Sequence, residues 1–288
     1  MIDESKMHNS PPDYEWSRIE ERYADACEDL PYFLDGARSD PKNLSLLIST
    51  ALDVACCGTA LKVDNKLILQ ALRLAGQASA AIFLAASSDK LPVKVQLGEG
   101  QPCTLTARPE ESTIHAFRWV RGFFLNAICR EYDLIDSMCR TPTEFLRQSS
   151  TKDPEYRYLF VDALRAFWTG ELQSGKIVLS ALEATDPERS DVHSADWTLH
   201  IDVPLLQLLF HVNSNDDDFT EQFPKAVALF QQYWLSSEER SKNWERLLAI
   251  ELTGIAALAH DRHMALHIDS ECVSNELVFG HKGTRKES

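Results

Sequence analysis

Two long apolar runs near the N-terminus constrain the fold more than any other feature of the sequence. They are NLSLLISTALDVACCGTALK (43–62) and NKLILQALRLAGQASAAIFLAAS (65–87), and their apolar residues fall on wide helical stripes. The second run is rich in Ala and Gly, which predicts that its helix packs closely against other helices. Neither run holds the roughly 18 to 20 continuous apolar residues of a bilayer span, so we expect no membrane partner.

Glycine is scarce, with 11 residues in 288, and few runs alternate strictly, so a large sheet is not expected. The exception is PVKVQLGEGQPCTLTAR (92–108), whose two short arms alternate around a Gly-containing loop. Val93 and Val95 would face one way, with Cys103 and Leu105 opposite them, which predicts a β-hairpin. We therefore predict an all-α, mostly helical chain, a multi-helical bundle of packed helical hairpins with one small β-hairpin near 92–108.

Helical patterns continue after the hairpin, over 112–139, 203–212, 218–235 and 243–262. Residues 153–188 predict a helical hairpin that is loosely tetratricopeptide-like, and because a single unit is visible we predict no repeat array. The expected organisation is an acidic N-terminal segment (1–40), one helical domain (41–279) with the β-hairpin inserted in it, and a polar, disordered tail (280–288).

The charge is acidic and uneven, −15 in total and −7 in residues 1–40, where 11 Asp and Glu face 4 Lys and Arg. Nucleic acid is disfavoured as a direct ligand because Lys and Arg drive phosphate binding, whereas a basic protein partner fits. The candidate partner-binding acids are Glu20, Glu21, Asp25, Glu28, Asp29, Asp216, Asp217 and Asp218. The polar N-terminus is not a signal peptide, and the seven cysteines lack zinc-like spacing, so we expect a cytoplasmic protein without a disulfide framework.

Two loops resemble ligand-binding motifs. GELQSGKI (170–177) nearly matches a phosphate-binding loop, but Ile177 replaces the hydroxyl residue that holds magnesium and a helical pattern precedes the motif. NSNDDDF (213–219) clusters oxygen ligands, yet an EF-hand would need Gly and Glu where Asp218 and Pro224 stand. We interpret the first as the turn of a helical hairpin and the second as a loop whose acids cap the next helix.

Near the C-terminus, ALAHDRHMALHIDSE (257–271) gathers His260, Asp261, His263 and His267. On one continuous helix these could form a His-x-x-His metal face, or His260 and Asp261 could serve a His-Asp phosphohydrolase together with His211 and Asp269. The alternative is a helix end, where His residues satisfy terminal carbonyls. No nucleophile elbow occurs, and we assign no catalytic, metal-binding or cofactor-binding residue.

Several blocks together resemble the immunity protein 49 family of bacterial polymorphic toxin systems, over about residues 44–275. They are VKVQLGEGQPCTLTAR, FRWVRGFFLNAICREYDLIDSMCRTP with its Arg130–Glu131 pair, EYRYLFVDALRAFWTGE, VPLLQLLFHVNSNDDDFTEQFPKAVALFQQYW and IELTGIAALAHDRHMALHIDSECV. In the family pattern Gly soon follows the helix-ending Asp. This sequence has His263 there, so we expect the helix to end differently.

The resemblance implies a non-enzymatic immunity protein that binds and neutralises a cognate secreted toxin in a stoichiometric complex, in type VI secretion or contact-dependent competition. The acidity adds the expectation that the toxin has a basic surface, as a nuclease has. Two alternatives stay open from the residues alone: a metal-dependent His-Asp phosphohydrolase and a general helical adaptor.

Overall fold

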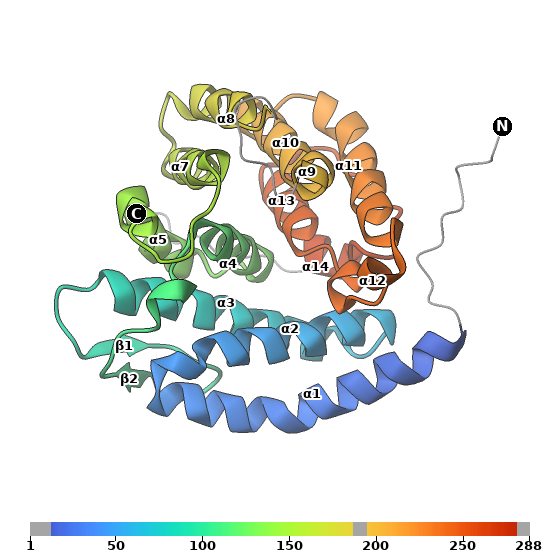
Figure 1. The fold of residues 1–288 in the computed structure, drawn as a ribbon. Helices are drawn as coiled ribbons and strands as arrows, with labels where there is room; N and C mark the ends of the chain where they lie inside the picture. The colour runs from blue at the N-terminus through green and yellow to red at the C-terminus, as the bar shows by residue number, and fades with distance from the viewer. Residues whose placement is uncertain (1–12, 187–194, 281–288) are drawn as a thin grey trace.

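Three long N-terminal helices form one layer of the molecule (Figure 1). The computed structural model describes residues 13–186 and 195–280, with side chains from Trp16 onward. The layer consists of α1 (Asp13–Ser39), α2 (Leu44–Ala60) and α3 (Asn65–Ser87), with the 3-10 turn η2 (Pro41–Asn43) between the first two. Helix α2 packs against both α1 and α3, because the apolar stripes of the two long runs face one another.

The remaining described helices stack above this layer (Figure 1). In chain order they are η3 (Glu111–Thr113), α4 (Ala116–Cys129), α5 (Tyr132–Cys139), α6 (Thr143–Arg147), α7 (Glu155–Thr169), α8 (Ser174–Glu183), α9 (Ala195–Trp197), the π-helical turn η4 (Thr198–Asp202), α10 (Val203–Ser214), α11 (Asp218–Leu235), α12 (Glu238–Ser241), η5 (Trp244–Leu247), α13 (Ile250–Asp261) and α14 (Asn275–Phe279). Helix α4 lies between α3 and α13 and packs against both. The predicted all-α, mostly helical fold is confirmed.

Glycines set the two crossings of α4. At the α3 crossing a Cβ on Gly76 would lie 2.7 Å from Oδ1 of Asn126, whose Nδ2 donates to the Gly76 carbonyl at 3.1 Å. At the α13 crossing a Cβ on Gly254 would lie 2.8 Å from Cβ of Phe124. The close packing predicted from small residues in α3 therefore also involves α4 and α13, and it leaves no room for larger side chains at these positions.

The predicted hairpin is present as β1 (Val93–Val95) and β2 (Cys103–Leu105), paired antiparallel with Val93 opposite Leu105 and Val95 opposite Cys103. Its loop is anchored on the helical layer. Gln77 of α3 accepts a hydrogen bond from the Gly98 amide at 2.7 Å, and Arg38 of α1 donates to the Leu97 carbonyl at 2.9 Å.

The predicted helical hairpin of 153–188 is formed by α7 and α8, which pack together. Gly170 ends α7 in the left-handed conformation, at a φ of 74°, and Gly175 lies in the first turn of α8. The resemblance to a phosphate-binding loop is therefore explained by the turn between two helices. Pro187 lies outside the described residues, and the tetratricopeptide likeness stays a prediction.

Two helical patterns are interrupted. The run over 112–139 breaks at Arg130, which is left-handed with a φ of 54°, and the run over 243–262 is divided into η5 and α13. Arg130 and Glu131 consequently do not pair on one helix. Arg130 reaches Asp261 of α13 and Glu131 lies 2.7 Å from Arg73 of α3. The break at Arg130 coincides with its contact to a distant segment of the chain.

Among the described helices, Pro41–Ala60 and Asn65–Ser87 are long and apolar enough to cross a membrane by length and composition alone. The sequence prediction counted continuous apolar residues and found no span. Mean hydropathy over a window tolerates scattered polar residues, so these two helices pass that criterion. The windows are 56% and 78% buried within the protein, as expected for the central helices of a packed bundle.

The division at residue 40 into an acidic segment and a helical domain stays a prediction. Residues 13–39 are helical and pack on α2. Residues 281–288, nearly all of the predicted disordered tail, lie outside the described part of the chain.

Candidate functional site

The acidic residues predicted on the N-terminal segment lie on the outer face of α1. All five are exposed: Glu20, Glu21, Asp25, Glu28 and Asp29. The opposite face carries the buried Ile19, Ala26 and Ala37 and packs on the body of the protein. None of the five carboxylates forms an ion pair or a hydrogen bond with another residue in the described part of the chain. We call this surface the α1 acidic face.

The three arginines of α1 contact neighbouring segments of the protein. Arg22 pairs with Asp53 of α2, and burial raises the pKa of Asp53 more than the neighbouring guanidinium lowers it. The Arg18 guanidinium carbon lies 5.7 Å from the centre of the Trp244 ring, and Arg38 donates to the β-hairpin loop. The arginines therefore attach α1 to its neighbours, and in the described part of the chain none of them forms an ion pair with the five carboxylates of the outer face.

An exposed aromatic residue lies within the α1 acidic face. Tyr32 is 75% exposed and follows Asp25 by seven residues and Glu28 by four, so the three side chains share one side of the helix. Tyr32 was not among the residues predicted to bind a partner. Its helical spacing from the predicted acids was the signal that could have found it.

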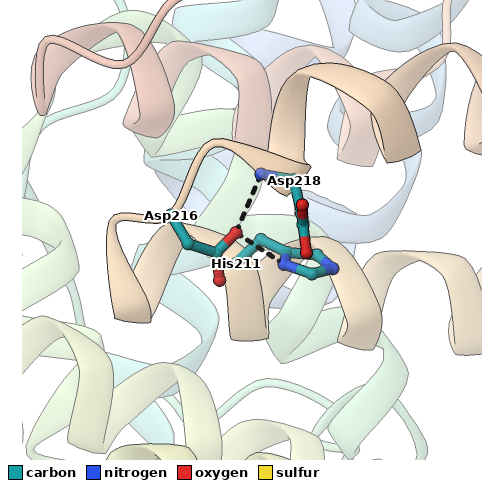
Figure 2. A group of neighbouring side chains, drawn as sticks. All are labelled: His211, Asp216 and Asp218. Carbon is teal, nitrogen blue, oxygen red and sulfur yellow. Dashed lines mark hydrogen bonds and ion pairs between the residues drawn. The ribbon is translucent and has the colours of Figure 1, made fainter.

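The other predicted acids surround the junction of α10 and α11. Figure 2 shows His211, Asp216 and Asp218 gathered at this turn. Nδ1 of His211 lies 2.8 Å from Oδ1 of Asp216, and the same oxygen accepts a hydrogen bond from the Asp218 amide at 3.1 Å. Asp217 and Asp218 are exposed. The predicted capping role is confirmed for Asp216, which satisfies an amide of the first turn of α11.

In the described part of the chain, one group of side chains could together hold a metal ion: His211, Asp216 and Asp218. One ligand atom of each lies within 4.8 Å of those of the others. The Asp216 oxygen already accepts two hydrogen bonds that fasten the helix junction. The geometry is accounted for by capping, and the EF-hand pattern has no counterpart in it.

The structure places the two predicted acidic sets on separate surfaces. In Figure 1, α1 runs along the bottom of the view, while the start of α11, the end remote from α12, lies at the top. Helix α1 packs mainly on α2, whereas α11 packs mainly on α10 and η4. A partner that contacts the α1 acidic face therefore need not reach Asp216, Asp217 and Asp218.

The histidine cluster near the C-terminus does not form one helical face. Helix α13 ends at Asp261, and His263 adopts the left-handed conformation at a φ of 62°. The His263 amide donates to the His260 carbonyl at 2.9 Å and the Met264 amide to the Ala259 carbonyl at 3.0 Å, which is a Schellman motif. The expectation that His263 would change the helix end is wrong, because the chain adopts the glycine-type ending with His in it.

Asp261 serves a structural contact. It accepts from Nε and Nη2 of Arg130 at 3.2 and 3.1 Å, and from the Tyr132 hydroxyl at 2.7 Å. Burial and this carboxylate raise the pKa of Tyr132, so the phenol stays a donor. The ring of His260 packs edge-on against Phe279 at 5.1 Å. His260 and Asp261 are thus engaged in other contacts, His211 is held at the α10–α11 junction, and Asp269 is exposed.

The sequence matches the model of one known protein family. A family model described as Immunity protein 49 matches residues 62–273, which is most of the chain. No curated protein and no solved structure matches the chain. The matched span begins after α2, so the α1 acidic face lies outside it. On this match, the chain belongs to the immunity protein 49 family.

Proposed function

We propose that this chain neutralises a cognate secreted toxin by forming a stoichiometric complex with it in the cytoplasm, and so protects the producing cell and its kin. Membership of an immunity protein family supports an immunity role and implies binding to a toxin. The neutralisation itself, by occupation of the toxin surface without any reaction, is the part that we propose.

The observation that carries the proposal is the α1 acidic face, with five exposed carboxylates and with Tyr32 on the same side of the helix as Asp25 and Glu28. Such a face attracts a basic surface and accelerates encounter at low salt. An exposed tyrosine supplies a large, rigid contact at small entropic cost, as aromatic anchors of interfaces do. The proposed partner is therefore a toxin domain with a basic surface, and the substrate cleft of a nuclease meets that description.

The first test is co-expression of the chain with the toxin domain encoded beside it. Growth should be rescued and the two proteins should co-purify in a 1:1 complex. If an active toxin domain is neither bound nor neutralised, the proposed function is wrong.

The second test assigns the surface. The triple variant Glu21→Lys, Asp25→Lys, Glu28→Lys should reduce the association rate constant at low salt by about tenfold or more, because steering depends on opposite charge. A matched triple variant, Glu110→Lys, Glu144→Lys, Glu183→Lys, changes net charge equally at exposed residues of other segments. Equal effects of the two variants would show that net charge acts and the α1 acidic face does not.

A further inference from the structure

An apolar groove opens beside the α1 acidic face, between α1, α2, α3 and the loop that joins β1 to β2. Its volume is about 380 Å³ and its lining is mostly apolar, with Cys27, Leu30 and Pro31 from α1 and Leu67 and Leu74 from α3. A space of this size belongs to the range of ligand sites and is far larger than the roughly 30 Å³ that one water takes up in the liquid. The groove could therefore receive two or three side chains.

The groove is accessible and its rim is anionic. Leu67 is 48% exposed at the start of α3. Glu20 lies seven residues before Cys27 on the same side of α1, and Glu99 lines the groove at the hairpin loop. Arg73 also lines it, but Glu131 balances its charge at 2.7 Å.

Carboxylates prevail on this rim even though Lys66 precedes Leu67. Glu28, three residues before Pro31, joins Glu20 and Glu99 on this side of the groove. Arg38 borders the hairpin loop, where it donates to the Leu97 carbonyl and pairs with Asp35 at 3.4 Å, so Lys66 is the cation left to oppose the three carboxylates. An apolar surface bordered by negative charge matches a segment that presents apolar side chains between Lys or Arg residues.

We propose that this groove receives apolar side chains of the toxin, from a segment whose flanking lysines and arginines meet the α1 acidic face. The inference rests on the proposed function and adds to it the anchoring contact. Acidic residues at the rim steer the partner, and burial of its apolar side chains between α1 and α3 slows dissociation.

The native chain offers its own probe for this groove. Of the seven cysteines, Cys27 is exposed, Cys103 is partly buried and the other five are buried. A maleimide dye should label Cys27 of the full chain readily, and bound toxin domain should slow the labelling by about tenfold or more, as expected when a thiol is covered by an interface. Cys27→Ser measures residual labelling at Cys103.

A variant pair tests the energetics. Leu67→Arg places a charged side chain at the groove and should weaken the toxin complex by about tenfold or more in Kd, since a desolvated anchor is lost. Leu172→Arg makes the same exchange in the α7–α8 turn, at a residue that is fully exposed, and should bind as the wild type does. Thermal melting of both variants checks that the fold is intact, and Cys27 labelling reads the groove without any substitution in it.

Each outcome decides between the proposals. If the wild-type chain does not bind the toxin domain, both the proposed function and the groove fail. If it binds while Cys27 stays unprotected and Leu67→Arg binds normally, the groove inference is wrong and the proposed function stands. Slow labelling of Cys27 in the free chain would mean that a bound small molecule or the chain's own residues occupy the groove. A dimer of the chain that Leu67→Arg dissociates would mean that a second copy occupies it. Either result would overturn the groove inference.

Discussion

Replacing Asp261 by Ala should cost about 3 kcal/mol of folding free energy, because it leaves a buried guanidinium without its counter-charge. The side chain of Arg130 is 2% exposed. Its five N–H groups find five acceptors: two oxygens of Asp261 and the carbonyls of Ile128, Leu277 and Val278, at 2.7 to 3.2 Å. Removing the carboxylate leaves two donors and one full charge unmatched.

The magnitude follows from this geometry. Breaking a fully buried pair costs roughly 3–5 kcal/mol. The side chain of Asp261 is 26% exposed, so water can reach the vacated space and the lower end of that range applies. For a chain of this length the same loss corresponds to a fall in Tm of about 5–10 °C.

The assay is urea unfolding, followed by circular dichroism, with comparison of midpoints at an unchanged slope. Asp261→Asn, which keeps one acceptor and loses the charge, should fall between Asp261→Ala and the wild type. Asp269→Ala, at an exposed residue, should change stability by less than about 0.5 kcal/mol. A loss below about 1 kcal/mol for Asp261→Ala would refute the reasoning. Loss of a stoichiometric metal with little loss of stability would favour the phosphohydrolase alternative.

Three further outcomes are expected. His263→Gly should stabilise the chain by about 1 kcal/mol relative to His263→Ala in urea unfolding, because Gly adopts the left-handed helix end without strain; equal stabilities would contradict this. Gly254→Ala should destabilise by roughly 2 kcal/mol through the clash at the α4–α13 crossing, whereas Gly175→Ala, whose Cβ would lie 3.4 Å from its neighbour, should not; equal melting temperatures would be inconsistent with that packing. Burial alone would raise the pKa of Asp153, but the hydrogen bond with His115 and the charge of Arg157 outweigh burial, so the pKa falls below its ordinary value. The folding free energy that the ionised Asp153 contributes is therefore fully present above about pH 4 and is lost as the pH drops through the lowered folded pKa. Asp153→Asn should therefore flatten the acid side of a stability–pH curve, and an unchanged curve would count against the contact.

The helices and the hairpin could be predicted because their signals are local. Apolar stripes identified the helices, and alternation around a Gly-containing loop identified β1 and β2 with the correct side chains opposite one another. The break at Arg130 could not be predicted in this way. Its left-handed backbone is supported by contacts with residues 131 to 148 positions away, and no window of sequence contains both partners.

The site was predictable only in part. Charge and helical pattern suffice to propose that Glu20, Glu21 and their neighbours face solvent, since polar residues line the outer side of an amphipathic helix. The groove beside them depends on four segments that meet in space, and Leu67 looks in the sequence like an ordinary core residue. For the cluster at His260 the sequence left a metal face and a helix end open, and the structure shows the helix end, because α13 stops at Asp261.

The two sides of α1 have different roles, and this affects how such a protein can change in evolution. The arginines of α1 hold it to its neighbours, while its outer carboxylates make no contact on which the fold depends. Substitutions on the outside are therefore close to neutral for folding, and they alter mainly what the surface attracts. Substitutions on one side of a single helix could therefore compensate for changes in the surface of a partner, while the packed interior stays as it is.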